Sequence, residues 1–196
     1  MVSEIFNSKI CVWEVNIEQF KRTSKFDKEL ENAFNFNGHV YDAQQKEGDA
    51  TSLKIGVMEK FLFFNDVIQL LNSSLNDQLD LLNVSKDKRN IQLIRCWANR
   101  MNRNSRGLIH HHQKGRMVLI LYYDVPEYSG DLVFIDSKHY DKLLMTEEEI
   151  PEGDKKYLKV KNGMCVLHES ELLHAVTKNL NDKPRQCLVF EFVSLI

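Results

Sequence analysis

Three consecutive histidines at positions 110–112 are the part of the sequence best suited to chemistry. In an extended chain alternate side chains point to the same side, so His110 and His112 can converge on one metal ion. A third ligand must come from elsewhere, and His174, in the run ELLHAVTKN, is the best candidate. A neighbouring strand of a barrel can bring its imidazole to within about 2 Å of the same metal. A solvated loop or a structural pair of histidines is the alternative interpretation.

Other residues compete for the same role. His111 and Gln113 could bind the metal in a different register, and His168 could replace His174 as the third ligand. A carboxylate such as Asp124 or Glu169 could also reach the metal. The run HESELLH does not match the HExxH pattern of zinc peptidases, because its two histidines are six residues apart and do not share a helix face.

An arginine follows the distal histidine after eleven residues. Arg185 begins an apolar strand pattern in which Cys187 and Val189 share its face, and the bulkier Leu188 and Phe190 lie on the other. We expect the slimmer face to border a lumen with room for a small anion. A guanidinium suits this task because its planar fork binds a carboxylate bidentately and keeps its charge. A surface arginine at the start of a strand is the alternative.

The second half of the chain carries a pattern of short strands separated by turn residues such as Ser129-Gly130 and Asn162-Gly163. This pattern is typical of an antiparallel sandwich or barrel. The predicted strands are 91–98, 116–124, 131–136, 157–161, 164–168, 172–178 and 185–194.

The first half reads mainly as helix. Residues 26–36 and 56–72 carry apolar residues at helical spacing, and 74–83 could continue as a second helix capped by Ser73 or Ser74. We therefore predict an α+β fold in a single domain, 1–196, with a mainly helical support region at 1–90 and a β-sheet core at 91–196.

Composition limits the partners. The 26 basic and 28 acidic residues give a formal charge of −2, which predicts no nucleic-acid partner. The N-terminal residues do not resemble a signal peptide, and no apolar stretch is long enough for a membrane helix. The four cysteines occur singly within apolar runs, as reduced core residues do. We expect a cytoplasmic protein without a membrane partner.

These segments together resemble the Fe(II)- and 2-oxoglutarate-dependent dioxygenases, and most closely a group of small oxygenases with a His-x-His motif. The resemblance covers roughly residues 91–194. The matching positions, in chain order, are Trp97, Asn99, His110, His112, Tyr122, Tyr123, Gly130, Gly163, His174, Val176 and Arg185.

The resemblance implies a double-stranded β-helix, a jelly-roll or cupin-like barrel, with N-terminal helices packed on one side. It implies Fe(II) held at one mouth by His110, His112 and His174. It also implies 2-oxoglutarate on two open positions of the iron, with Arg185 on its far carboxylate. Tyr122 could help to hold the cosubstrate or pack in the barrel. Asn99, at the end of a predicted strand, could donate a hydrogen bond to the cosubstrate or form a turn. Position 112 departs from the family, which usually has aspartate or glutamate there. Three neutral imidazoles leave the charge of the metal uncompensated.

The implied activity is an oxygenase that uses molecular oxygen and hydroxylates a small-molecule, amino-acid or peptide substrate. The oligomeric state stays open, a homodimer included. Two alternatives remain: a cupin-like three-histidine metalloenzyme of the thiol-dioxygenase type that does not use 2-oxoglutarate, and a non-catalytic β-barrel binding module. The insert 137–156 resembles a lid, and its Glu147–Glu149 run fits either a solvated helical turn or a surface that attracts a cationic substrate.

Overall fold

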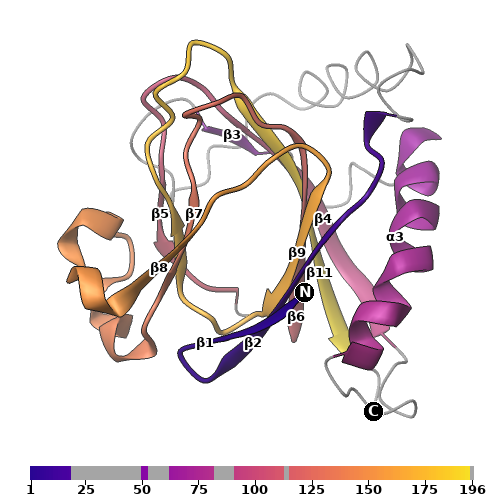
Figure 1. Cartoon of the computed structure of the whole chain (residues 1–196), viewed down its shortest axis with the longest axis horizontal. Coiled ribbons are helices and arrows are strands. Elements are labelled where there is room, and N and C mark those ends of the chain that lie inside the picture. The colour runs from indigo at the N-terminus through magenta and orange to yellow at the C-terminus, as the bar shows by residue number, and fades with distance from the viewer. Residues whose placement is uncertain (19–49, 53–61, 82–90, 113–114, 195–196) are drawn as a thin grey trace.

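The computed structural model describes residues 1–18, 50–52, 62–81, 91–112 and 115–194 (Figure 1). Within them the chain forms two antiparallel β-sheets that face each other (Figure 1). The seven-stranded sheet contains, in spatial order, β1 (Val2–Ile5), β2 (Ser8–Glu14), β9 (Met164–Glu169), β6 (Met117–Asp124), β11 (Arg185–Ser194), β4 (Ile91–Met101) and β3 (Ala50–Ser52). The four-stranded sheet contains β5 (Gly107–His110), β10 (His174–Val176), β7 (Leu132–Ile135) and β8 (Lys155–Leu158).

The interior between the sheets is built from side chains that alternate along the strands. Ile120, Val166 and Val189 from the large sheet are buried in one cluster with Leu132 and Phe134 from the small sheet. This alternation places one face of each sheet inward, as period-two strands require. The predicted antiparallel jelly-roll barrel is therefore confirmed, and all seven predicted strands are present with shifts of a few residues at their ends.

Helix α3 (Leu62–Leu81) covers the outer face of the large sheet (Figure 1). Its residues at four-residue spacing, Val67, Leu71, Leu75 and Leu79, are buried against the sheet. The two helical segments predicted on either side of position 73 are one continuous helix here. Ser74 is not a cap but lies inside α3, where its hydroxyl donates to the Leu71 carbonyl and accepts from the Trp13 indole. The predicted helix at 26–36 lies outside the described residues.

The insert after β7 covers the outer face of the small sheet. Three short 3-10 turns, Ser137–Lys142, Glu147–Glu149 and Glu152–Asp154, lie on the opposite side of the molecule from α3 (Figure 1). Backbone hydrogen bonds of 2.9 Å tie Ile109 to Met145 and Leu144. Ile150 and Leu143 pack on the outward residues of this sheet. The insert is thus a packed wall of the barrel.

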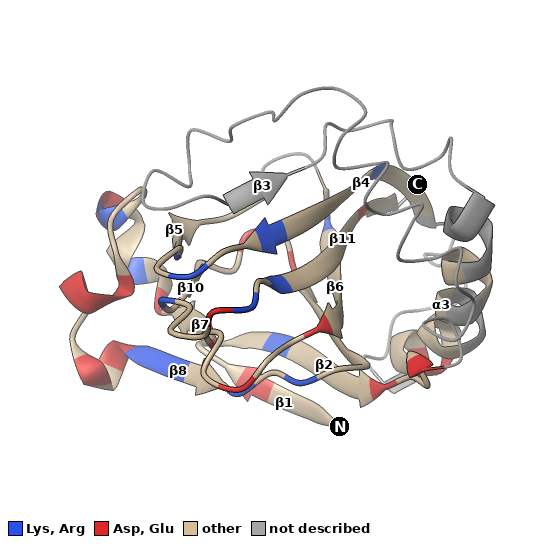
Figure 2. Cartoon of the chain, turned by 90° about the horizontal axis from the view of Figure 1, so that it is seen from above, with Lys and Arg blue, Asp and Glu red and all other residues tan. Residues whose placement is uncertain are grey.

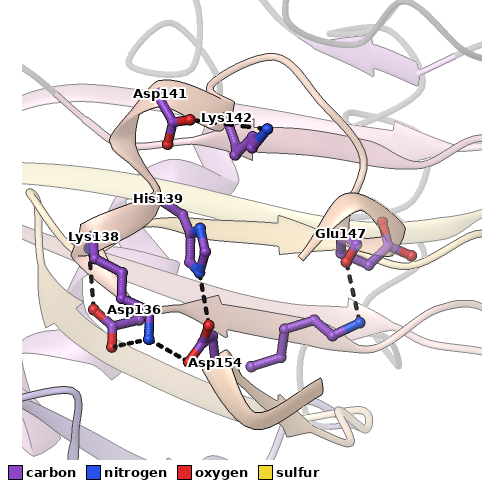
Figure 3. A network of polar contacts seen from close by, with 8 residues as sticks. Asp136, Lys138, His139, Asp141, Lys142, Glu147 and Asp154 are labelled. Atoms are coloured by element: carbon purple, nitrogen blue, oxygen red, sulfur yellow. Dashed lines mark hydrogen bonds and ion pairs between the residues drawn. The ribbon is translucent and has the colours of Figure 1, made fainter. Parts of the chain in front are cut away.

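A polar network holds the insert together (Figure 3). The ring of His139 lies 2.9 Å from Asp154 Oδ2, and Lys138 pairs with the same carboxylate. Lys155 Nζ donates to the Glu147 carbonyl at 3.1 Å. Figure 2 shows the acidic residues of the insert on this outer wall. Because the Glu147 side chain is buried, its role in this run is structural.

The structure differs from the sequence prediction in two elements. Residues 2–14, placed in a mainly helical region, form the hairpin of β1 and β2 instead. Strand β5, which ends at His110, was not predicted. All four cysteines are free and buried, as expected. In the part of the chain that the structure describes, no helix has both the length and the apolar character needed to cross a membrane.

Candidate metal centre

Strand pairing brings two of the predicted histidines together. His110 ends β5 and His174 begins β10, and the two residues are direct partners in the register of these strands. Their ring centroids are 4.2 Å apart. His112 follows two residues later, where its backbone N–H donates to the Ser170 carbonyl at 2.8 Å. One ligand atom from each of the three histidines lies within 4.8 Å of the others. The geometry therefore brings His110, His112 and His174 together.

Hydrogen bonds on the far side of each ring fix its tautomer. The Nδ1 atoms of His110 and His174 lie 2.7 and 2.8 Å from the carbonyls of Leu108 and Leu172, which can only accept. The corresponding atom of His112 lies 2.6 Å from Oε1 of Glu191. Each Nδ1 therefore carries the proton, and each Nε2 keeps a free lone pair.

The free lone pairs face one another. Nε2 of His112 lies 3.3 Å from Nε2 of His174, and in the neutral Nδ1–H tautomers neither atom carries a proton. Two acceptors at this distance repel each other unless a cation lies between them. This arrangement fits a metal ion, since the neutral imidazole nitrogen is the form that binds metals.

Burial favours the neutral form of the His110 and His174 rings. It lowers the pKa of His110 to about 4, with a further contribution from the neighbouring His112. Burial also lowers the pKa of His174 well below its ordinary value, and the surrounding imidazoles add to the effect. At neutral pH no proton has to leave these rings before a metal binds.

Glu191 is a functional residue that the sequence analysis missed. Its carboxylate is buried on the inner face of β11, where Oε1 binds His112 and Oε2 lies 2.9 Å from Nε of Arg95. A carboxylate behind a metal-binding histidine orients the ring and raises its basicity. The two carboxylates considered from the sequence, Asp124 and Glu169, are not part of the ligand group. The carboxylate in contact with this group is that of Glu191, on the far side of the His112 ring.

Two further histidines border the site. His168 is buried on β9, with its ring centroid 4.8 Å from that of His174, but it is not in the ligand group. Its Nδ1 lies 2.8 Å from the Glu169 carbonyl, and its Nε2 has no hydrogen-bond partner among the described residues. His111 packs instead on Tyr140, with ring centroids 5.3 Å apart. The geometry favours the pair at 110 and 112; Gln113, the other half of the alternative register, lies outside the described residues.

Arg185 lies in the interior, as the strand pattern predicted. It is 2% exposed, and its guanidinium carbon lies 4.8 Å from the centroid of the Tyr122 ring. One nitrogen donates to the Met101 sulfur at 3.3 Å, whereas Nε and Nη2 have no hydrogen-bond partner among the described residues. A buried charge without a counter-ion costs several kcal/mol. An anion bound beside the guanidinium would compensate this charge.

The two supporting residues lie beside this arginine. Tyr122 and Asn99 flank Cys187 in the register of β6, β11 and β4, and Cys187 is two residues from Arg185. The Tyr122 hydroxyl and the Asn99 side-chain oxygen are both buried, and neither has a hydrogen-bond partner among the described residues. Burial raises the pKa of Tyr122, so its hydroxyl remains a hydrogen-bond donor. Asn99 lies within β4 rather than at a strand end, where it was expected.

A family model described as "Putative 2OG-Fe(II) oxygenase" matches residues 95–191 of the chain. A search of curated proteins found no match. Among solved structures, HygX from Streptomyces hygroscopicus with nickel and 2-oxoglutarate bound has a TM-score of 0.67 at 13% identity, over 95% of this chain and 83% of that one.

Two further structures share the fold. The carbocyclase SnoK from nogalamycin biosynthesis, described as non-heme and alpha-ketoglutarate-dependent, has a TM-score of 0.66 at 13% identity, over 94% of this chain and 79% of its own. A Pseudomonas putida prolyl-4-hydroxylase has a TM-score of 0.57 at 10% identity, over 95% and 93%. At such identities these likenesses concern the fold alone.

Proposed function

We propose, from the premise that residues 95–191 belong to the 2OG-Fe(II) oxygenase family, that this protein is an Fe(II)- and 2-oxoglutarate-dependent oxygenase. In this proposal His110, His112 and His174 bind the iron. Arg185 binds the far carboxylate of 2-oxoglutarate, and Tyr122 and Asn99 support it.

One observation carries the proposal: the same interior holds a place for a cation and a place for an anion. One ligand atom from each of the three histidines lies within 4.8 Å of the others. The buried guanidinium of Arg185, with two nitrogens that lack a partner among the described residues, lies on β11, the strand that also carries Glu191. A dicarboxylate with a keto group at one end fits both places, since one end can chelate a metal while the other accepts hydrogen bonds from arginine.

The protein's own residues supply binding, orientation and electrostatics. The Arg185 fork fixes the far end of the cosubstrate, and Tyr122 can donate its hydroxyl to the same carboxylate. Glu191 holds His112 in one orientation and offsets part of the charge of the metal. Apolar side chains such as Ile120 and Val189 exclude water from the interior. Bound iron and 2-oxoglutarate would supply the electrons that activate dioxygen, with release of succinate and carbon dioxide.

Among the described residues, the ligand group contains no carboxylate, and this favours a second candidate. A three-histidine metalloenzyme of the thiol-dioxygenase type would use the same imidazoles without 2-oxoglutarate. It gives Arg185 no task, however, and would leave a buried guanidinium uncompensated. A non-catalytic binding module would likewise leave the opposed lone pairs of His112 and His174 unexplained. We therefore prefer the oxygenase.

For the reaction we propose hydroxylation of a small-molecule, amino-acid or peptide substrate, with dioxygen as the second substrate. The solved structures with this fold include proteins described as a carbocyclase, an epimerase and a prolyl-4-hydroxylase. We also propose a cytoplasmic setting, which the four free and buried thiols support. A homodimer remains part of the proposal, to be tested by sedimentation.

The test is succinate formation from 2-oxoglutarate by the Fe(II)-loaded protein in air, first without added substrate and then across a substrate panel. The proposal predicts succinate from the wild type and none above background from His174→Leu. A protein that binds Fe(II) stoichiometrically and yet never forms succinate would support the thiol-dioxygenase type instead.

A further inference from the structure

His168 is a fourth buried imidazole beside the three proposed ligands, and the proposed function gives it no task. It is 0% exposed and faces the interior, because Met164 and Val166 at two-residue spacing on β9 belong to the interior cluster. Its ring centroid lies 4.8 Å from that of His174 and 6.4 Å from that of His112. It therefore borders the metal site.

The hydrogen bond of Nδ1 determines what His168 can do. The Glu169 carbonyl, 2.8 Å away, can only accept, so Nδ1 carries the proton of the neutral ring. Nε2 is then a lone-pair acceptor. It is fully buried and has no partner among the described residues. Buried polar atoms in native proteins nearly always have a hydrogen-bond partner, so a donor is missing.

The geometry also shows what His168 is not. The ligand atoms that lie within 4.8 Å of one another come from His110, His112 and His174, and His168 is outside this group. The ring of Phe134 packs edge-on against it at 5.7 Å and offers no donor. Since no described residue supplies the partner, we look for it in a group bound in the interior.

We propose that Nε2 of His168 accepts a hydrogen bond from an O–H or N–H group carried by the ligand that occupies the open side of the metal. This inference rests on the metal site proposed above. In the resting site a metal-bound water would be the donor. During turnover a hydroxyl or amino group of the substrate would take its place, so His168 would select substrates that present a donor near the metal.

The first arm of the test measures Ni(II) binding to the full chain by calorimetry. His168→Leu removes the acceptor at similar volume, and His168→Gln retains an acceptor oxygen. Both variants should bind Ni(II) within about threefold of the wild type, a difference of under 1 kcal/mol. Loss of nickel binding in both folded variants would make His168 a metal ligand and overturn the inference. Failure of the wild type to bind nickel would overturn the proposed metal site as well.

The second arm compares two chelators on the nickel-loaded protein. Acetohydroxamate carries an N–H donor, and N-methylacetohydroxamate has a methyl group in its place. The wild type should prefer the N–H compound by about fivefold to tenfold more than His168→Leu does, the contribution of one hydrogen bond. His168→Gln should keep part of this preference.

A crystal structure of the nickel-loaded protein without chelator identifies the resting donor. A water between nickel and Nε2 of His168 supports the metal-bound source. If this water is absent but the chelator preference is present, the organic ligand is the only source of the hydrogen-bond donor. If there is no such water and the chelator preference equals that of His168→Leu, the inference is wrong.

Discussion

Nε2 of His112 and Nε2 of His174 lie 3.3 Å apart, so that in the neutral Nδ1–H tautomers their lone pairs are opposed. The opposition is imposed from outside the pair, because Glu191 and the Leu172 carbonyl occupy the Nδ1 atoms. The protein thus maintains a repulsive contact that a bound cation would relieve.

Replacing the carboxylate behind His112 should weaken metal binding. Glu191→Gln keeps an oxygen that can accept from Nδ1, but it removes the negative charge next to Arg95. Replacing a carboxylate that hydrogen-bonds to a metal-binding histidine typically lowers metal affinity about 10-fold to 100-fold. Calorimetric titration with Ni(II) measures the effect. Glu169→Gln is the matched control, because this carboxylate is exposed and outside the ligand group, and it should leave the affinity unchanged.

Restoring the family's usual carboxylate at position 112 should fail on its own. His112→Asp would remove the N–H that Glu191 accepts and place a second buried carboxylate beside it. Two like charges in a buried site oppose each other's ionisation. We expect the single variant to bind Fe(II) at least about tenfold more weakly, and His112→Asp combined with Glu191→Gln to recover wild-type affinity. Equal affinities for the single and double variants would show that Glu191 and position 112 are not coupled.

Replacing Arg185 should separate binding from stability. Arg185→Met fills similar volume without the unpaired charge, so the free energy of unfolding should stay the same or rise by up to about 4 kcal/mol. Affinity for 2-oxoglutarate should fall at least about 100-fold, whereas Ni(II) affinity should not change. Urea unfolding and calorimetry measure the two effects. Arg103→Met serves as control, because that arginine pairs with Asp182 at the surface. Severe unfolding of Arg185→Met would mark the arginine as structural.

The metal-free protein should lose stability as the pH falls from about 6.5 to 4. Burial lowers the pKa of His110 to about 4 and that of His168 to about 3, so the folded state favours the neutral rings. The neutral rings contribute their full share to the free energy of unfolding above the unfolded pKa of about 6.5. This share is lost as the pH falls toward the folded pKa values, by about 3 kcal/mol for His110. Urea unfolding with a chelator present, at pH 7.5 and at pH 5, measures the loss. His110→Leu should make the dependence shallower; a stability independent of pH over this range would contradict the burial argument.

The convergence of His110, His112 and His174 could be predicted from the sequence because it follows largely from short-range rules. Alternation along an extended chain puts His110 and His112 on one side, and the strand pattern puts Arg185 inside. Glu191 follows the same alternation but could not be assigned a role. Its function depends on strand register, which places β11 next to β4 and so brings Arg95 opposite it, and register is not legible in one sequence.

The N-terminal hairpin was missed for a local reason. A two-residue hairpin turn of type I′ needs positive φ at both central residues and is usually recognised by Asn-Gly. Here Phe6 and Asn7 occupy these positions, with φ of 49° and 65°. A phenylalanine in the left-handed region is uncommon, so the turn carried no signal. Strand β5 was missed because it has only four residues, Gly107–His110, and the last of them begins the histidine run.

The proposal that iron and 2-oxoglutarate bind together at the three histidines and Arg185 is tested by anaerobic titration of the Fe(II)-loaded protein with 2-oxoglutarate, followed by visible absorption. Chelation of the keto acid by iron on the three histidines should produce a weak charge-transfer band in the wild type. At the same 2-oxoglutarate concentration the band should be absent in Arg185→Met, although that variant still binds iron. Stoichiometric iron binding without any band, or a band of equal strength in Arg185→Met, would contradict the account.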